Sequence, residues 1–515
     1  MSSSTDIEKH DAKLPVVDDQ TIASDEALSI NEGHVYDTKM SWWKRHWHTI
    51  RSDFTETRGI DRVPPDQRQP GNFSAYVQMI SLWLSANLTA NHVALGLLGP
   101  SIYGLSFLDS ALCATFGVMV GCACTGYMST FGPQSGNRTM IIARYSMGWW
   151  PSRICVVLNL VIMLGYGMID CVVGGQMLSA IAGGNVSVIV GVIIVAVITW
   201  SVTVIGLPVL EKYERYGWIP QACVLLILAG CAGPYFDVSA SSVGTTKTIV
   251  GNRLSIFALC LSAPSAWAPA GADFYVYFDQ RTSKKLTFFL TWLGETLGYV
   301  ICLYLGIGLA TGLEGRADWT DADDVGPGAV LVAGFNGLGA FGHFCACIMM
   351  LGVIANNVLG TYACGLGFQC LGSWPLKVPR MVWNTFSVVV YTICAAVGRN
   401  CLYDIFQNFL SLMGYWVAIW IVITLQDQLI FRRRSGYTWE DWNDSARLPV
   451  GLAALATFII GWAGAVLGMN QVYFMGPVAS LIGDDGTDIG LFIGSSWAAL
   501  VYPPLRALEK KAIGR

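Results

Sequence analysis

Long apolar segments separated by short polar ones fill the chain from about residue 75 onward. A helix needs about 20 mostly apolar residues to cross the hydrocarbon core of a bilayer. Twelve segments approach that length, and they lie at 75–99, 108–131, 154–182, 186–207, 217–236, 254–278, 287–312, 329–353, 381–398, 408–430, 449–469 and 488–504. The pattern therefore predicts an all-α polytopic membrane protein with twelve transmembrane helices.

The Lys and Arg residues between these segments predict the orientation of the chain. Loops on the cytosolic side of a membrane protein carry an excess of Lys and Arg. If the N-terminus is cytosolic, only four of the 31 Lys and Arg fall outside, namely Lys247, Arg253, Arg316 and Arg399. We expect both termini in the cytosol, with an N-terminal tail at 1–72, the transmembrane domain at 73–505 and a C-terminal tail at 506–515.

The composition narrows the class of protein. Hydrophobic residues make up 53% of the chain and charged ones only 13%, about half the usual share. The net charge of -4 gives no basic field, so nucleic-acid binding is unsupported. Neither a phosphate-binding Gly-rich loop, nor a hydrolase elbow, nor a cluster with metal-ligand spacing occurs in the sequence. We expect no enzyme, no resident cofactor and no metal.

Two of the predicted spans are interrupted. The first contains the polar run 83–92, and the sixth contains Pro264 and Pro269, each of which removes a backbone donor. Irregular backbone at membrane depth is tolerated where protein or a water-filled cavity covers it. Paired interruptions in corresponding positions of two halves indicate the binding site of a transporter. Spans one and six fit a five-plus-five inverted repeat with two additional helices, although ordinary kinked spans would give the same pattern.

Ionisable residues inside spans mark further candidates. Tyr166 and Asp170 lie one helical turn apart on one face of the third span. A carboxylate at that depth requires a partner, a proton or a cationic substrate. Glu295 in the seventh span is a second candidate for a proton path. Asp427 lies close to Arg432, and we interpret these two as an interfacial ion pair.

Other polar residues carry weaker expectations. The eighth span ends on a polar stretch that contains Asn356, Asn357 and Thr361. His92 and His343 are lone histidines, which we expect to have satisfied structural roles.

The N-terminal tail carries its own expectations. The first 40 residues are polar and predict disorder. Trp42, Trp43 and Trp47 follow them among basic residues, which indicates either a segment at the inner membrane surface or a plain cytosolic tail.

Short motifs between about residues 55 and 500 resemble one family. They are ETRGI at 56–60, SANLTAN at 85–91, GGQ at 174–176, YERY at 213–216, ANN at 355–357, GYW at 414–416, WND at 442–444 and GMNQV at 468–472. Together they resemble the purine–cytosine permeases, the fungal-type branch of the nucleobase:cation symporter family.

The resemblance implies proton-coupled uptake by alternating access, in the plasma membrane, with sodium as the alternative ion. It implies a substrate site between helices one, three, six and eight. Ser85 would bond the substrate, Trp267 would stack on its ring, and Asn356 or Asn357 would read its edge. Flat heteroaromatic substrates suit such a site, because the ring face can stack while edge groups specify it.

The chain departs from the family at the expected site. It has Tyr166 where the family usually has Trp, Asp170 where the family has Asn, and LGT at 359–361 where a Pro-Asn-Asn run is usual. An ionised Asp offers acceptors only, whereas Asn also donates. Three interpretations of Asp170 are open. It binds a substrate with an extra donor or a positive charge, or it carries the coupling proton, or it is protonated and simply takes the place of Asn.

We therefore expect a secondary-active, proton-coupled symporter that imports a small nitrogen heterocycle of the purine/cytosine type. The expected partners are this substrate and membrane lipid. One alternative is the same fold with a pyridoxine-like, thiamine-like or specialised-metabolite cargo, and another is a transceptor that senses a metabolite. The expected substrate contacts are Ser85, Tyr166, Asp170, Trp267, Asn356, Asn357 and Thr361, and the candidates for proton coupling are Asp170 and Glu295.

Overall fold

A computed structural model describes residues 28–31, 34–37, 59–69, 73–205 and 215–515. The chain divides into two compact units, 1–57 and 58–515. In the first unit, β1 (Leu28–Asn31) and β2 (His34–Asp37) form an antiparallel pair, and the disorder expected for the first 40 residues stays a prediction. The predicted membrane-surface segment around Trp42 lies outside the described residues.

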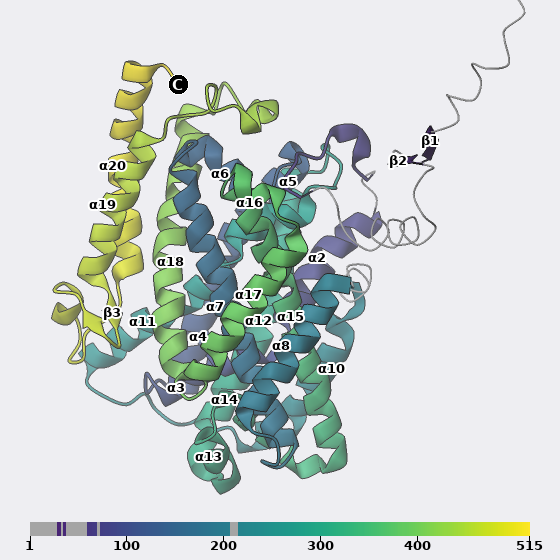
Figure 1. Cartoon of the computed structure of the whole chain (residues 1–515). Coiled ribbons are helices and arrows are strands. Elements are labelled where there is room, and N and C mark those ends of the chain that lie inside the picture. The colour runs from purple at the N-terminus through teal and green to yellow at the C-terminus, as the bar shows by residue number, and fades with distance from the viewer. Residues whose placement is uncertain (1–27, 32–33, 38–58, 70–72, 206–214) are drawn as a thin grey trace, which may run out of the picture. The chain divides into compact units, whose positions relative to one another are not determined.

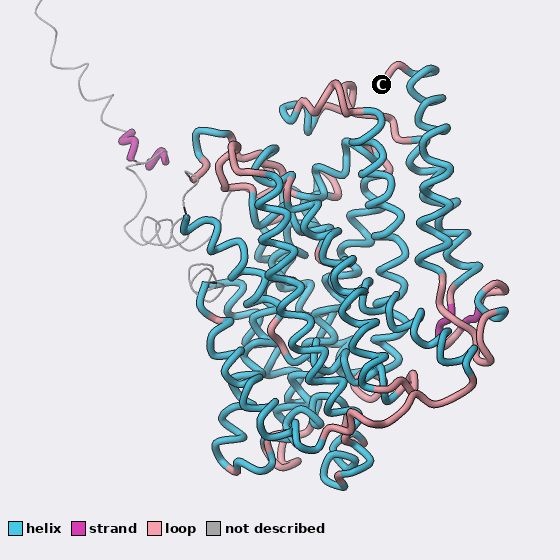
Figure 2. The backbone as a smooth tube through the Cα atoms, turned by 180° about the vertical axis from the view of Figure 1, so that it is seen from behind, coloured by secondary structure: helices cyan, strands magenta, loops and turns pink. Residues whose placement is uncertain are grey.

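The second unit is a bundle of helices (Figure 1). Within the described ranges, eight helical stretches are long and apolar enough to cross a membrane. They contain α4 (Phe107–Ser129), α7 (Ser152–Ile181), α10 (Trp218–Ala232), α11 (Thr246–Ser265), α12 (Lys284–Thr311), α15 (Ala340–Cys370), α17 (Arg380–Gly398) and α18 (Leu402–Gln426). Figure 2 shows that almost all the remaining backbone of this unit is also helix or loop.

Further helices complete the bundle. The apolar ones are α8 (Val188–Ile205), α14 (Pro327–Ala333) and α19 (Leu452–Gly468). The others are α2 (Phe73–Asn87), α3 (Ala90–Ser101), α5 (Phe131–Ser135), α6 (Thr139–Met147), α13 (Ala317–Asp323), α16 (Ser373–Lys377) and α20 (Gly490–Ile513). A two-residue hairpin pair, β3 (Asn470–Gln471) and β4 (Phe474–Met475), lies between α19 and α20.

The outer faces of the bundle are apolar. Large side chains such as Phe116, Leu226 and Ile393 are more than half exposed. Exposed aliphatic and aromatic surface on this scale suits hydrocarbon rather than water as the surrounding medium. The bundle has the surface of an integral membrane protein.

The first interrupted span is confirmed as two helices. α2 ends at Asn87, α3 begins at Ala90, and Thr89 between them has an extended backbone with φ -144°. Ser, Thr and Asn side chains compete with the helical hydrogen bonds of the backbone, which explains why the helix ends at this polar run.

The sixth span changes helix type at its interruption. α11 ends at Ser265, and a 3-10 helix, η4, runs from Ala268 to Tyr275. Pro269 lies in the first turn of η4, where its missing N–H leaves no helical hydrogen bond unmade. The backbone of the two residues between the helices stays right-handed, so the span tightens here rather than unwinding.

The prediction for the eighth span is wrong at both ends. The apolar run 329–353 joins two helices, because α14 ends at Ala333 and α15 begins only at Ala340. Gly339 between them has φ +56°, a conformation that favours glycine and interrupts the helix. α15 continues to Cys370, so the polar stretch predicted at the end of this span lies in the middle of the helix.

Helix packing positions the broken segments in the interior. α2 and α3 pack against α12, α4 packs against α11, and α7 packs against α15. A side-chain carbon at Gly298 of α12 would lie only 2.8 Å from Asn87 Cβ, so this close approach requires glycine. α19 and α20 stand together at one edge beside α18 (Figure 1). α20 is helical to Ile513, which includes most of the predicted C-terminal tail.

Candidate functional site

A narrow cavity lies where α7 and α15 meet the junction of α11 and η4. It is a crevice with about 240 Å³ of space between atoms, and it is too narrow to hold the centre of a water-sized sphere. Five of the residues that line it were predicted to contact a substrate, namely Tyr166, Asp170, Trp267, Asn356 and Asn357. The rest of the lining is Met163, Gly167, Ala266 and Gly360. All five are buried, with exposed fractions of 7% or less. The structure therefore brings most of the predicted contacts to one place.

Aromatic rings form one wall of the cavity. The rings of Tyr166 and Trp267 are nearly parallel, with centroids 6.4 Å apart and planes at 25°. The Tyr166 hydroxyl donates to the carbonyl of Ala263 at 2.8 Å, which ties α7 to the end of α11. Trp83 of α2 packs edge-on against Trp267 at 5.9 Å and donates to the Tyr275 hydroxyl at 2.7 Å. This wall can present an aromatic face to a flat ring.

Asp170 supplies a carboxyl group to the lining of the cavity, and its exposed fraction is 0%. Its Oδ1 accepts a hydrogen bond from Asn91 Nδ2 at 2.6 Å. Asn91 lies in the first turn of α3, so the interruption of the first span supplies this partner. Asp170 Oδ2 has no hydrogen-bond partner among the described residues. One carboxyl oxygen is therefore held by the protein while the other is open to a donor or a proton.

The two asparagines of α15 differ in what they bind. Asn356 Nδ2 donates to the carbonyl of Ala86 at 2.6 Å, which ties α15 to the end of α2. Asn357 Nδ2 donates to the sulfur of Cys171 at 3.5 Å, and sulfur is a weak acceptor; the Tyr391 hydroxyl also lies near the Asn357 side chain. Asn357 is thus the one of the pair whose amide is only weakly held by the protein.

Two predicted contacts, Ser85 and Thr361, do not line the cavity. The Ser85 hydroxyl accepts from the backbone N–H of Trp218, at the start of α10, at 3.0 Å. The Thr361 hydroxyl lies 3.4 Å from Asn357 Oδ1 and 3.3 Å from the Tyr391 hydroxyl. Thr361 therefore lies behind Asn357, and Ser85 lies in a helix contact.

Glu295 lies on α12, outside the lining of the cavity, and its exposed fraction is 0%. Neither of its carboxyl oxygens has a hydrogen-bond partner in the part of the chain that the structure describes. The prediction that His92 is satisfied is wrong for one ring nitrogen, because its Nε2 also lacks a partner among those residues. Only the position of His92 within the polar run 83–92 pointed to this.

The predicted pair of Asp427 and Arg432 is confirmed, with Arg432 Nε 2.6 Å from Asp427 Oδ2. Arg506 Nε lies 3.5 Å from Asp427 Oδ1, and the Tyr502 hydroxyl donates to the same oxygen at 3.2 Å. Within the described ranges, no group of three or more His, Cys, Asp or Glu side chains is arranged to hold a metal ion.

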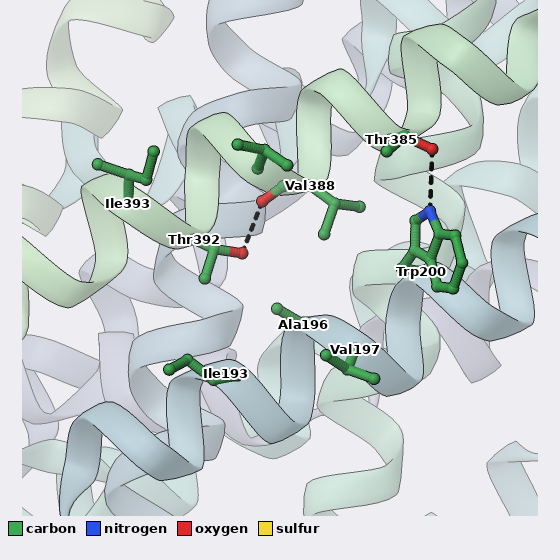
Figure 3. A pocket seen from close by; sticks show the side chains of 9 residues that line it. Ile193, Ala196, Val197, Trp200, Thr385, Val388, Thr392 and Ile393 are labelled. Atoms are coloured by element: carbon green, nitrogen blue, oxygen red, sulfur yellow. Dashed lines mark hydrogen bonds between the residues drawn. The ribbon is translucent and has the colours of Figure 1, made fainter.

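A larger hollow of about 350 Å³ lies between α8 and α17 (Figure 3). Its walls are mostly aliphatic, with Trp200 at one end. The Trp200 ring nitrogen donates to the Thr385 hydroxyl at 2.9 Å, and the Thr392 hydroxyl donates to the carbonyl of Val388 at 2.6 Å. These polar groups are already paired, so the hollow offers little to orient a polar ligand. The cavity beside α7 is therefore the candidate site.

Comparison with known proteins finds similarity over most of the chain. Residues 63–494 match a family described as permeases for cytosine/purines, uracil, thiamine and allantoin. The chain is 31% identical to the vitamin B6 transporter TPN1 of Saccharomyces cerevisiae, over 89% of this chain and 88% of that one. It is 32% identical to the purine-cytosine permease fcyB of Emericella nidulans, over 89% and 90%.

The fold is that of the nucleobase-cation-symport-1 family transporter Mhp1. The closed conformation of Mhp1 with bromovinylhydantoin bound matches with a TM-score of 0.65 at 14% identity, over 89% of this chain and 96% of that one. Its inward-facing conformation matches with a TM-score of 0.67 at 13% identity, over 89% and 95%.

Proposed function

The chain belongs to the family of permeases for cytosine/purines, uracil, thiamine and allantoin, and on that premise we propose a secondary-active, proton-coupled symporter that imports a small nitrogen heterocycle. The observation that carries the proposal is the cavity itself, whose lining includes an aromatic wall and an open carboxyl oxygen. By analogy with the fungal relatives, the proposed location is the plasma membrane, with both termini in the cytosol.

The proposed architecture has twelve crossings. The pair α2–α3 forms the first, and the pair α11–η4 forms the sixth. Both interruptions lie beside the cavity: Asn91 follows the first, and Trp267 lies within the second. Interruptions five crossings apart support a five-plus-five inverted repeat followed by α19 and α20. Mhp1 shares this fold and is known in closed and inward-facing conformations, which supports alternating access.

In the proposed complex the heterocycle lies against the ring of Trp267 or Tyr166. A donor on its edge bonds Asp170 Oδ2, and Asn357 offers a donor and an acceptor to the same edge. Such polar contacts fix the orientation of the ring, because a site with buried unpaired groups rejects analogues that leave them unpaired. Tyr166 contributes its ring alone, since its hydroxyl already donates to Ala263.

A second candidate cargo is vitamin B6. The relatives at about the same identity include both a vitamin B6 transporter and purine-cytosine permeases. The open Asp170 oxygen favours a ring that carries hydroxyl donors or a protonated nitrogen, and pyridoxine has hydroxyl donors. Cytosine and adenine also carry N–H donors, so a substitution of residue 170 is needed to separate the two cargoes.

The test is uptake of radiolabelled cytosine, adenine, hypoxanthine and pyridoxine into cells that lack their own carriers. Wild type, Asp170→Asn and the exposed control Asp321→Asn are compared at equal surface expression. Nucleobase uptake by the wild type supports a nucleobase carrier. If the wild type takes up pyridoxine and Asp170→Asn takes up nucleobases instead, the result supports vitamin B6 as the cargo. A wild type at the surface that takes up none of the four contradicts the proposal and favours a sensing role.

A further inference from the structure

The carboxyl group of Glu295 is buried without compensation. It has no exposed surface, and both its oxygens lack hydrogen-bond partners in the described part of the chain. An ionised carboxylate in such surroundings is costly, whereas a protonated one is not. Asp170 differs, since Asn91 donates to one of its oxygens and the group lines the cavity.

The groups that face Glu295 are neutral or weak donors. From α4, Thr125 donates instead to the carbonyl of Pro264 at 2.9 Å, and Cys122 offers only a thiol. Cys124 is a second thiol on the same helix. From η4, the Tyr275 hydroxyl is engaged by Thr291, one turn before Glu295 on α12. No Lys or Arg belongs to this set, so a proton is the simplest compensating charge.

Tyr299 lies one turn beyond Glu295 on α12 and faces the first interruption. Its ring packs against His92 of α3, with centroids 3.9 Å apart. His92 Nδ1 lies 2.9 Å from the carbonyl oxygen of Asn87. Because a carbonyl only accepts, Nδ1 must carry the hydrogen, which leaves a lone pair on the partnerless Nε2. An acceptor nitrogen therefore lies next to the Tyr299 ring.

Tyr299 also connects Glu295 to the substrate cavity. Its hydroxyl has no hydrogen-bond partner in the described ranges, and its electrostatic neighbours include Tyr166 and Glu295. Tyr166 is the ring on the α7 side of the aromatic wall. A change in the charge of Glu295 therefore changes the electrostatic surroundings of Tyr299 and Tyr166, and Tyr166 lines the cavity.

We infer that Glu295 is the binding site of the coupling proton and that it is separate from Asp170, which serves the substrate. This inference rests on the proposed function. The proton binds a Glu295 carboxyl oxygen from water on the outer side and returns to water on the inner side. His92 Nε2 and the Tyr299 hydroxyl border its route. The neutral acid is the form that the closed bundle accommodates, so proton binding favours closure around the substrate.

The test uses the purified full-length chain in proteoliposomes, with whichever of cytosine, adenine, hypoxanthine or pyridoxine the wild type carries. Glu295→Gln, Asp170→Asn and the exposed control Glu314→Gln are compared in two assays. One assay measures accumulation driven by a pH gradient, and the other measures exchange of preloaded substrate without a gradient. Glu295→Gln should keep exchange and lose accumulation, while Asp170→Asn should keep accumulation of any substrate that it still exchanges.

Several outcomes would overturn the inference. They are accumulation by Glu295→Gln under a pH gradient, loss of accumulation with retained exchange in Asp170→Asn, and wild-type accumulation that follows sodium rather than pH. If Glu295→Gln also loses exchange, the variant Glu295→Asp is measured. Accumulation regained by Glu295→Asp supports a proton site at residue 295. Loss of exchange in a folded Glu295→Asp protein shows a structural role instead. A wild type that moves none of the four compounds contradicts the proposed function instead.

Discussion

Two regions of the bundle bury carboxyl groups and surround them with different partners. Asp427 and Glu509, near the end of α18 and on α20, lie with Arg432, Arg506 and Tyr502 in a set that we term the ion cluster. Around the broken helices, Asp170 keeps one open oxygen and Glu295 keeps two. Both regions are buried, and only the ion cluster supplies partners to each of its carboxyl groups.

The ion cluster holds helices together. Glu509 accepts from the backbone N–H groups of Gly451 and Leu452, both at 2.9 Å, and so caps the start of α19. Its other oxygen accepts from Arg506 at 2.8 Å. Arg432 also donates to the carbonyl of Tyr145 on α6 at 2.8 Å. Paired charges of this kind specify packing, whereas the open oxygens beside the cavity leave bonds for a substrate or a proton to make.

The largest expected effect is on folding, from Arg506→Met in the ion cluster. Removing one partner from a buried ion pair costs about 3–5 kcal/mol, because the other charge is left uncompensated. We expect a marked fall in the apparent melting temperature of the detergent-purified protein. Arg434→Met, at an exposed position, is the matched control. Equal melting temperatures for the two variants would contradict a structural role for the ion cluster.

The next effect is on substrate affinity, from Trp267→Ala in the aromatic wall. Loss of ring stacking costs about 0.5–1.5 kcal/mol, which is up to roughly tenfold in KM for uptake. Trp267→Phe should recover most of the loss because it retains a ring. Trp150→Ala, at an exposed tryptophan, should leave KM unchanged. An unchanged KM for Trp267→Ala at normal surface expression would remove Trp267 from the site.

The smallest effect separates the two asparagines of α15. Asn357→Ala should raise KM with little loss of stability, because its amide makes only a weak contact with Cys171. Asn356→Ala should instead lower stability by about 1 kcal/mol, since the carbonyl of Ala86 loses a donor. KM and melting temperature are measured for both variants. The reverse assignment would show that Asn356 is the residue that reads the substrate.

The sequence predicted the helices and their interruptions better than it predicted which residues contact one another. Polar residues and prolines interrupt apolar helices by local chemistry, so the breaks near Thr89 and Pro269 could be foreseen. The eighth span was misplaced because the connection from Gly334 to Gly339 carries one polar side chain, Asn336, and is too short to stand out. The mean hydropathy of a span-length window stays high across such a short connection.

Tertiary contacts decide what the sequence left open. Asn91 and Asp170 are 79 positions apart, and no local pattern pairs them. Asn356 and Asn357 are adjacent and chemically identical, so only the position of the α2 end tells them apart. The resemblance implied that Ser85 contacts the substrate, yet in the structure its hydroxyl lies at the start of α10.

The most direct test of the contrast between open and satisfied carboxyl groups is proton movement. A lightly buffered suspension of expressing cells is followed with a pH electrode while substrate is added. We expect the medium to become alkaline for wild type and for Asp427→Asn molecules that reach the surface. The response should disappear in Glu295→Gln although exchange persists. An alkaline shift of wild-type size in Glu295→Gln would show that Glu295 is not the binding site of the coupling proton.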